Sequence, residues 1–500
     1  MYKFKKSFAV LVFLVLTTIA GAQKQDSIIL PSIKDVIAQG LNANYDIKIT
    51  KKTMDIYEGI TKSYSGAFDP NIGFSTDYLG GIDPTIQFKD KFKMDLYYYQ
   101  NTKLGINFST GTNFMRLTDI SNQNDLENIN GLWFEMGIPL LRGLGSYNKT
   151  TVNLKISKLK YNSTKINFEY EITYFIRNVI LAYTKLYIDQ QLINSYDTIL
   201  SDLNKVFSDL EIEVSKNIIP KAELIIVNTS IKQVESKRQL ALTQMNNSYL
   251  ELMKLLGQEN VPEIIHSVKM PYLIPDFELD NVKLYVVQKI ANKERIIKNS
   301  LEFMNQENRK NIAEYELKSA KNEKLNDFQL KLKYNYYAME TNVDWNNSIV
   351  LGSGYYPGSS YGLTLNYLLP IGNNNKKGLY ISKMEEFDME NQQTEKLVFN
   401  KEKELQDVGN SLLGAIKLYE MQKEIAKLRW QVYKNEMLKY NIGKSTQMDI
   451  LTSNENYVKA IINLKEIQMS MIDLFINFKF LCNQIPRSSS ELSQFSVFSY

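Results

Sequence analysis

The chain has 500 residues, of which 44% are hydrophobic and 23% are charged, so it is long enough for several cores or one long repeated architecture. Lysine and arginine number 59 against 55 acidic residues, and a formal charge of +4 is too small to indicate a nucleic-acid partner. The single cysteine, Cys482, and the single histidine, His266, exclude an intrachain disulfide framework and a Cys/His zinc site. Aromatic residues are plentiful, with 32 tyrosines and 23 phenylalanines against 3 tryptophans.

The N-terminal segment has the pattern of an export signal. Three lysines precede an apolar stretch over 8–20, and a small-x-small cleavage motif covers 20–22. The apolar stretch is shorter than the roughly 20 residues of a spanning helix. We therefore expect a signal peptide over 1–22 that is cleaved, in preference to an uncleaved anchor. No cysteine follows the motif, so it offers no lipid anchor.

Five long segments lack proline and contain little glycine, and we predict that they are helices: 147–207, 223–256, 281–326, 376–440 and 446–481. At 1.5 Å per residue, segments of about 35 to 65 residues would reach roughly 50 to 100 Å if straight. In the last segment, apolar residues from Tyr457 to Leu481 recur every three or four positions, which is the seam of a coiled coil. An ordinary helical bundle gives the same stripe, so the helices alone indicate no function.

Four short segments alternate strictly between apolar and polar residues and predict strands: 71–78, 132–138, 328–336 and 361–369. Lipid outside and water inside select an aromatic-rich apolar face opposite a polar one, and a soluble, half-buried sheet gives the same alternation. The export signal and the excess of tyrosine favour the membrane. Lys331 and Lys333 lie on a polar strand face, where they either line a lumen or are simply solvated.

The order of the predicted elements occurs twice: helix, strand, turn-rich loop, strand, long helix, break, helix. The helix break over 217–224 lines up with the break over 443–450. We therefore expect the following segments: a first repeat over 23–265, a linker over 266–280, a second repeat over 281–482 and a loose, polar C-terminal tail over 483–500.

Two strands per repeat give about four per chain, too few to close a barrel. An open sheet edge cannot face lipid, so we expect the chain to oligomerise. Three copies would supply about twelve strands, within the range of outer-membrane barrels. Between the first two strands, 104–109 also alternates, and we interpret 81–130 as an extracellular hairpin above the barrel in preference to further wall strands.

These elements, in this order, resemble the TolC family of outer-membrane efflux channels over nearly the whole mature chain. The duplicated plan carries the resemblance together with three motifs: Pro139-Leu140-Leu141-Arg142-Gly143, Leu252-to-Gly257, and Tyr440-Asn441-Ile442-Gly443 followed by Asp449-Ile450-Leu451. The resemblance implies an α+β membrane protein with a tandem structural repeat. It implies a homotrimer whose outer-membrane β-barrel is continuous with a long periplasmic α-helical coiled-coil barrel.

Partners and site residues also follow from the resemblance. A periplasmic adaptor (membrane fusion) protein and an inner-membrane pump or type I exporter would complete an efflux or secretion system. The tips of the helical hairpins would contact the adaptor, and they match Asn217, Pro220, Gly443, Lys444 and Ser445. Glycine adopts positive φ at no steric cost, which suits Gly443, and asparagine at 217 is the next most tolerant residue.

An acidic constriction at the periplasmic end is a further feature that the resemblance implies. Asp449 matches its first aspartate, whereas Thr452 stands at the second acidic position. Three symmetry-related Asp449 carboxylates would form a ring that favours cations. Equally, Asp449 has the place of an acid in the first turn of a helix, where the helix dipole stabilises it.

We expect a channel and no enzyme, with no catalytic residues, cofactor or metal. His266 lies in the linker, where solvation is expected, and no oxyanion or glycine-rich element accompanies a Cys482/His266 pair. The alternative of another class is a periplasmic or surface coiled-coil scaffold without a conducting pore. A conduit would need detergent for extraction and would conduct ions, whereas a scaffold would leave the membrane in high salt.

Overall fold

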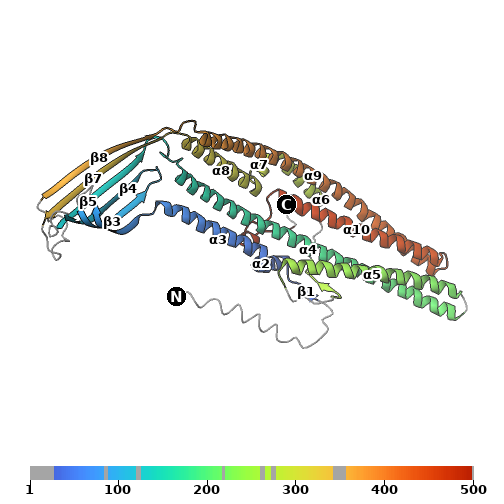
Figure 1. The fold of residues 1–500 in the computed structure, drawn as a ribbon. Helices are drawn as coiled ribbons and strands as arrows, with labels where there is room; N and C mark the ends of the chain where they lie inside the picture. The colour runs from blue at the N-terminus through green and yellow to red at the C-terminus, as the bar shows by residue number, and fades with distance from the viewer. Residues whose placement is uncertain are drawn as a thin grey trace, which may run out of the picture. The chain divides into compact units, whose positions relative to one another are not determined.

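The computed structural model describes residues 28–83, 88–119, 126–216, 220–258, 265–271, 278–341 and 356–497. The chain divides into two compact units, and each combines segments from both predicted repeats (Figure 1). Unit 1 comprises the ranges 1–48, 170–297 and 402–500, and unit 2 comprises 49–169 and 298–401.

Unit 2 contains an antiparallel six-stranded sheet in the order β2-β3-β4-β5-β7-β8 (Figure 1). The strands are β2 (Asn71–Asp83), β3 (Phe88–Asn101), β4 (Asn107–Asp119), β5 (Leu126–Pro139), β7 (Asp327–Thr341) and β8 (Tyr356–Leu368). The pairing of β5 with β7 joins the two halves of the chain. Just after β5, Arg142 Nη2 lies 2.5 Å from Asp327 Oδ2. The arginine of the Pro139–Gly143 motif therefore connects the end of β5 to the start of β7.

The expectation of about four strands per chain is wrong, because β3 and β4 pair with the four predicted strands in one six-stranded sheet. The turn between them reaches the end of the sheet where α4 begins: Asn148 and Thr151 donate to the Lys103 carbonyl at 2.9 and 2.7 Å. A hairpin above the other strands could not make these contacts. The alternation in β3 is obscured by Tyr97-Tyr98-Tyr99, since tyrosine suits either face of a sheet.

Helical segments of unit 2 are α8 (Leu301–Glu323), all but the first four residues of α3 (Tyr45–Ser65), the start of α4 (Lys149–Ser215) and the start of α9 (Asn374–Asn441). The one-turn 3₁₀ helix η1 (Gly66–Phe68) precedes β2. The remainder of α4 and α9 belongs to unit 1. There the other helices are α2 (Ile33–Ala43), α5 (Lys221–Leu255), α6 (Leu279–Ala291), α7 (Lys293–Lys298), α10 (Gln447–Leu481) and α11 (Ser489–Leu492). Within the predicted linker, β6 (Val268–Lys269) pairs in parallel with β1 (Ile28–Ile29).

The core of unit 1 forms where the apolar stripes of its helices meet. Among its fully buried side chains are Ile37, Ile180, Met245, Leu252 and Phe478. None of the helices in the described ranges has an apolar stretch long enough to cross a membrane.

The C-terminal segment is packed onto unit 1, which contradicts the expected loose tail. Ile485, Leu492 and Val497 are buried. Lys479 on α10, only 3% exposed, donates to the carbonyls of Ser496 and Val497 at 3.2 and 3.1 Å. Three widely spaced apolar side chains and one buried donor are enough to anchor a segment that is polar on average.

Candidate functional site: the helix tips of unit 1

The α9–α10 tip is a tight turn closed by backbone hydrogen bonds. Gly443 has φ of 68°, and its N–H donates to the Tyr440 carbonyl at 2.8 Å while the Lys444 N–H donates to the Lys439 carbonyl at 2.8 Å. This pair of bonds is the Schellman motif that ends helices at a left-handed residue. A Cβ at Gly443 would meet no atom within 4 Å, so the turn requires glycine for its conformation and not for space.

Asp449 and Thr446 form a capping box at the start of α10. The Asp449 N–H donates to Thr446 Oγ1, and Asp449 Oδ2 accepts from the Thr446 N–H at 3.0 Å and from its hydroxyl at 2.6 Å. These hydrogen bonds from Thr446 lower the pKa of the exposed Asp449 carboxyl. Within one chain Asp449 is therefore an acid that caps a helix.

Ser445 links the two helices across the turn. Its hydroxyl donates to Glu436 Oε2 at 2.6 Å, and Lys439 Nζ lies 2.6 Å from Glu436 Oε1. The bonds from Lys439 and Ser445 lower the pKa of Glu436. Lys444 is exposed beside them. The second tip is thus a charged turn held by hydrogen bonds and an ion pair.

The first tip is described only in part. α4 ends at Ser215, and α5 begins after Pro220, the N-cap residue, whose carbonyl accepts from the Glu223 N–H at 3.2 Å. Asn217, the counterpart of Gly443, lies outside the described residues.

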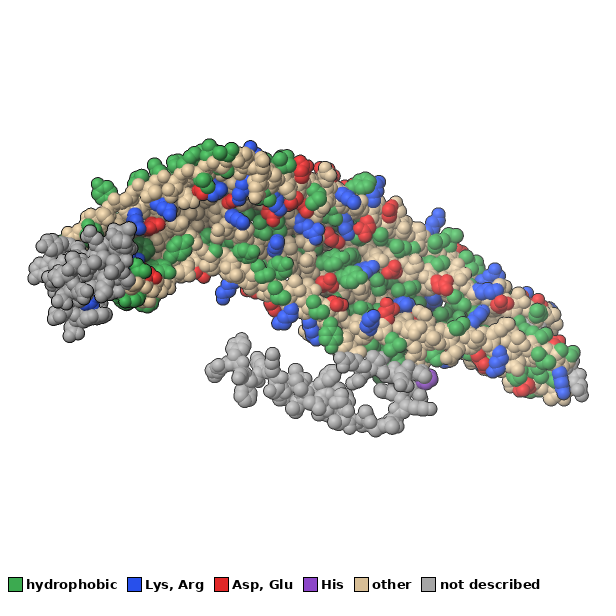
Figure 2. Space-filling view, viewed as in Figure 1, with side chains coloured by type: hydrophobic (Ala, Val, Ile, Leu, Met, Phe, Trp, Pro, Cys, Tyr) green, Lys and Arg blue, Asp and Glu red, His purple; other side chains and the backbone are tan. Residues whose placement is uncertain are grey.

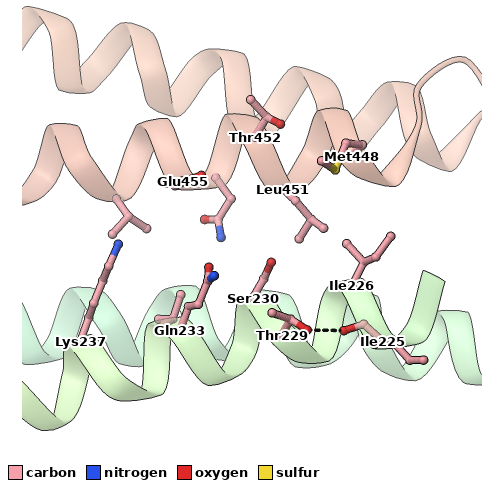
Figure 3. A pocket seen from close by; sticks show the side chains of 13 residues that line it. Ile225, Ile226, Thr229, Ser230, Gln233, Lys237, Met448, Leu451, Thr452 and Glu455 are labelled. Carbon is pink, nitrogen blue, oxygen red and sulfur yellow. Dashed lines mark hydrogen bonds between the residues drawn. The ribbon is translucent and has the colours of Figure 1, made fainter. Parts of the chain in front are cut away.

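A groove of about 290 Å³ lies between α5 and α10 beside the tips (Figure 3). Ile226 and Leu451 point toward each other across it, and Met448, which is 63% exposed, lies at its outer end. Thr452 lines this groove, whereas Asp449 is not among its lining residues. Thr452 follows Asp449 by three residues on α10, so the two are neighbours on the helix surface, and the constriction predicted for them stays a prediction.

One buried polar group is directed to the same groove. Asn454 is 3% exposed, lines the groove, and has an Oδ1 that accepts no hydrogen bond from the part of the chain that the structure describes. A buried acceptor without a partner is energetically costly, so Asn454 is an exception among the polar groups near the tips. Sequence reasoning missed Ile225, Ile226, Met448 and Leu451; their signal is a cluster of apolar residues just behind two polar turns.

The sheet of unit 2 holds the two predicted lumen lysines. Lys331 and Lys333 are exposed on its polar face, and Lys333 Nζ lies 3.8 Å from Glu135 Oε2. Lys331 stands opposite Gly137 and Thr364 on the neighbouring strands.

His266 and Cys482 do not form a reactive pair. His266 is exposed, whereas Cys482 is buried, and burial raises the pKa of its thiol to about 12. In the described part of the chain, no group of three or more His, Cys, Asp or Glu residues could hold a metal ion.

No family profile and no curated protein matches the sequence, but solved structures match the fold. The outer-membrane channel OprN is similar with a TM-score of 0.63 and 10% identity, covering 92% of this chain and 91% of that one. The Campylobacter jejuni outer membrane channel CmeC is similar with a TM-score of 0.60 and 11% identity, covering 92% of this chain and 88% of that one. The outer membrane protein VceC of Vibrio cholerae is similar with a TM-score of 0.61 and 11% identity, covering 91% of this chain and 97% of that one. The chain therefore has the fold of outer-membrane channels, as its resemblance to the TolC family predicted.

Proposed function

We propose that the chain is the outer-membrane channel component of a tripartite efflux or type I secretion system. It passes cargo from an inner-membrane transporter to the exterior, and it resides in the outer membrane with a long periplasmic portion. The observation that carries this proposal is a sheet with one exposed apolar face, in a chain with the fold of outer-membrane channels.

One face of the sheet is largely apolar, and a row of residues follows it across the six strands with Thr110 as its polar member. The register aligns Ile72, Tyr98, Thr110, Phe134, Tyr334 and Tyr361 in one row. Ile72 is 80% exposed and Tyr361 is 90% exposed, and hydrophobic side chains gather along this part of the molecule in Figure 2. A soluble scaffold would have to cover such a surface, whereas lipid stabilises it.

A homotrimer would complete the sheet. Each of the edge strands, β2 and β8, pairs on one side only among the strands described. Because an unpaired edge is costly in lipid, the edges of neighbouring copies are expected to pair and to close the barrel.

The α5–α10 groove and the α9–α10 turn are the proposed contact surface for a periplasmic adaptor. The groove presents the exposed apolar side chains of Ile225, Ile226 and Met448, which suits the apolar face of an amphipathic helix. Pro220, Gly443, Lys444 and Ser445 would hold the turns that flank this surface.

Single-channel conductance in planar bilayers tests the proposal. The detergent-purified protein should form stable pores, and Asp449→Ala should change conductance or cation preference if three carboxylates form a ring. Because Asp449 also caps α10, Thr446→Ala is the matched control: it weakens the same cap and keeps the carboxylate. A folded protein that is soluble without detergent and forms no pores would refute the proposal.

A further inference from the structure

Aromatic rings lie flat against the polar face of the sheet. In three places the register sets a glycine directly opposite an aromatic residue of the neighbouring strand: Gly73 with Tyr97, Gly111 with Trp133, and Gly358 with Tyr337. A Cβ on Gly73 would lie 2.2 Å from Cζ of Tyr97, and one on Gly111 would lie 3.0 Å from Cε2 of Trp133. Each ring therefore covers the backbone of its glycine and turns its other face away from the sheet.

Tyr97 and Trp133 line a cavity of about 440 Å³ on this face. Two ion pairs flank the rings: Lys93 with Asp95 at 2.6 Å, and Lys333 with Glu135 at 3.8 Å. Other lining groups are the amides of Asn113 and Asn335 and the hydroxyls of Ser75 and Ser109. The charges of the four ionic side chains balance, and the cavity offers many donors and acceptors.

We propose that this cavity binds a saccharide chain. The apolar face of a pyranose ring packs against a flat aromatic face, and its hydroxyls both donate and accept hydrogen bonds. A hydroxyl bonds to either member of an ion pair without separating the two charges. A cationic ligand would compete with Lys93 for Asp95, and an anionic ligand would compete with Asp95 for Lys93, so a neutral polyhydroxylated ligand fits best.

The two strands that the sequence pattern did not predict as wall strands build most of this site. β3 supplies Lys93, Asp95 and Tyr97, and β4 supplies Gly111 and Asn113. A four-stranded sheet would retain Trp133 but would lack the glycine over which its ring lies. The extra pair of strands therefore enlarges the sheet and also creates the recognition surface.

That the site faces the conduit rests on the proposed function, whereas binding itself is measurable without a pore. Trp133 reports on binding once the other two tryptophans are replaced in a Trp345→Phe, Trp430→Phe background. In detergent, maltohexaose should change the Trp133 fluorescence saturably. Tyr97→Ala should weaken binding by about fivefold, since one aromatic contact is lost. Tyr361→Ala, on the apolar face, is the control and should bind as the parent does.

Two charged probes decide the class of ligand. Benzyltrimethylammonium and benzenesulfonate should bind more weakly than maltohexaose. Tighter binding of either probe, or no saturable change with maltohexaose in a folded trimer, would overturn the proposal.

Bilayer recordings separate this proposal from the function. If the protein forms conducting pores that maltohexaose neither binds nor blocks, the proposed binding site is refuted and the proposed channel function stands. If maltohexaose binds saturably to a protein that forms no pores, the proposed binding site stands and the proposed channel function is refuted.

Discussion

Gly443 fixes the path of the chain between α9 and α10, because a left-handed residue must follow the end of α9. Gly443→Ala should lower the free energy of unfolding by about 1 kcal/mol, since alanine is strained at positive φ. Gly414→Ala, at an open position within α9, is the matched control and should raise it by about 1 kcal/mol, because alanine favours the helix. Urea unfolding followed by circular dichroism measures both. Equal effects of the same sign would contradict this account of the turn.

Lys479 holds the C-terminal segment and should make stability depend on pH. Burial lowers the pKa of Lys479 to about 8 in the folded protein, whereas the unfolded chain keeps an ordinary lysine pKa. Between these two pKa values the unfolded chain binds more protons, so this group makes the protein more stable as pH rises from about 8 to about 10. The gain in urea midpoint over that range should be smaller in Lys479→Met than in the wild type. Parallel profiles for the two proteins would refute the assignment.

At the scale of elements, the two tip helices are closely matched. α5 and α10 each have 35 residues. Both end in the same pair of backbone bonds, around Gly257 with φ of 63° and around Asn483 with φ of 57°. These matches support the predicted tandem repeat and its register, which remain a prediction together with the repeat boundaries.

A second feature of the elements is an exposed apolar stripe on α9. It recurs every three or four positions and consists of Leu418, Met421, Ile425, Leu428 and Val432. This spacing is the seam of a coiled coil, so a second copy of the chain is the partner that the proposed trimer supplies. Leu412 and Ile416 are buried and lie on a different face of α9 from this stripe.

Leu428→Asp should therefore reduce the trimer fraction, because a carboxylate would be buried between copies. Lys427→Asp is the control, since Lys427 is exposed on another face of α9. Light scattering of the detergent-solubilised protein measures the trimer fraction. An unchanged trimer in Leu428→Asp, or equal loss in both variants, would show that the stripe is not the interface.

For the whole molecule, the number of strands sets the width of the proposed pore. Deleting 88–119 removes β3 and β4 and should leave four strands per chain. Because barrel diameter grows roughly linearly with strand number, the cross-section and conductance should fall to about half. The control replaces 121–124 with glycine and serine and leaves all six strands in the chain. A deletion variant that forms trimers with wild-type conductance would contradict a six-stranded contribution per chain.

Local patterns were sufficient for much of this protein. Proline-free segments predicted the long helices, and strict alternation predicted β2, β5, β7 and β8. Gly443 with Asp449 marked a helix end followed by a helix start. These features depend on neighbours within a few residues along the chain, so the sequence contains them directly.

Contacts between distant segments decided the rest. β3 and β4 belong to the same sheet as the predicted strands because they pair with β2 and β5, and their turn bonds to the start of α4. The C-terminal segment packs onto unit 1, where Lys479 donates to two of its carbonyls. The α5–α10 groove and the glycine–aromatic pairs exist only when two helices or two strands meet in register. The sequence by itself determined the periodicity and ends of the main elements, whereas only the tertiary structure decided strand number, register and binding surfaces, because these depend on long-range pairing that no local pattern specifies.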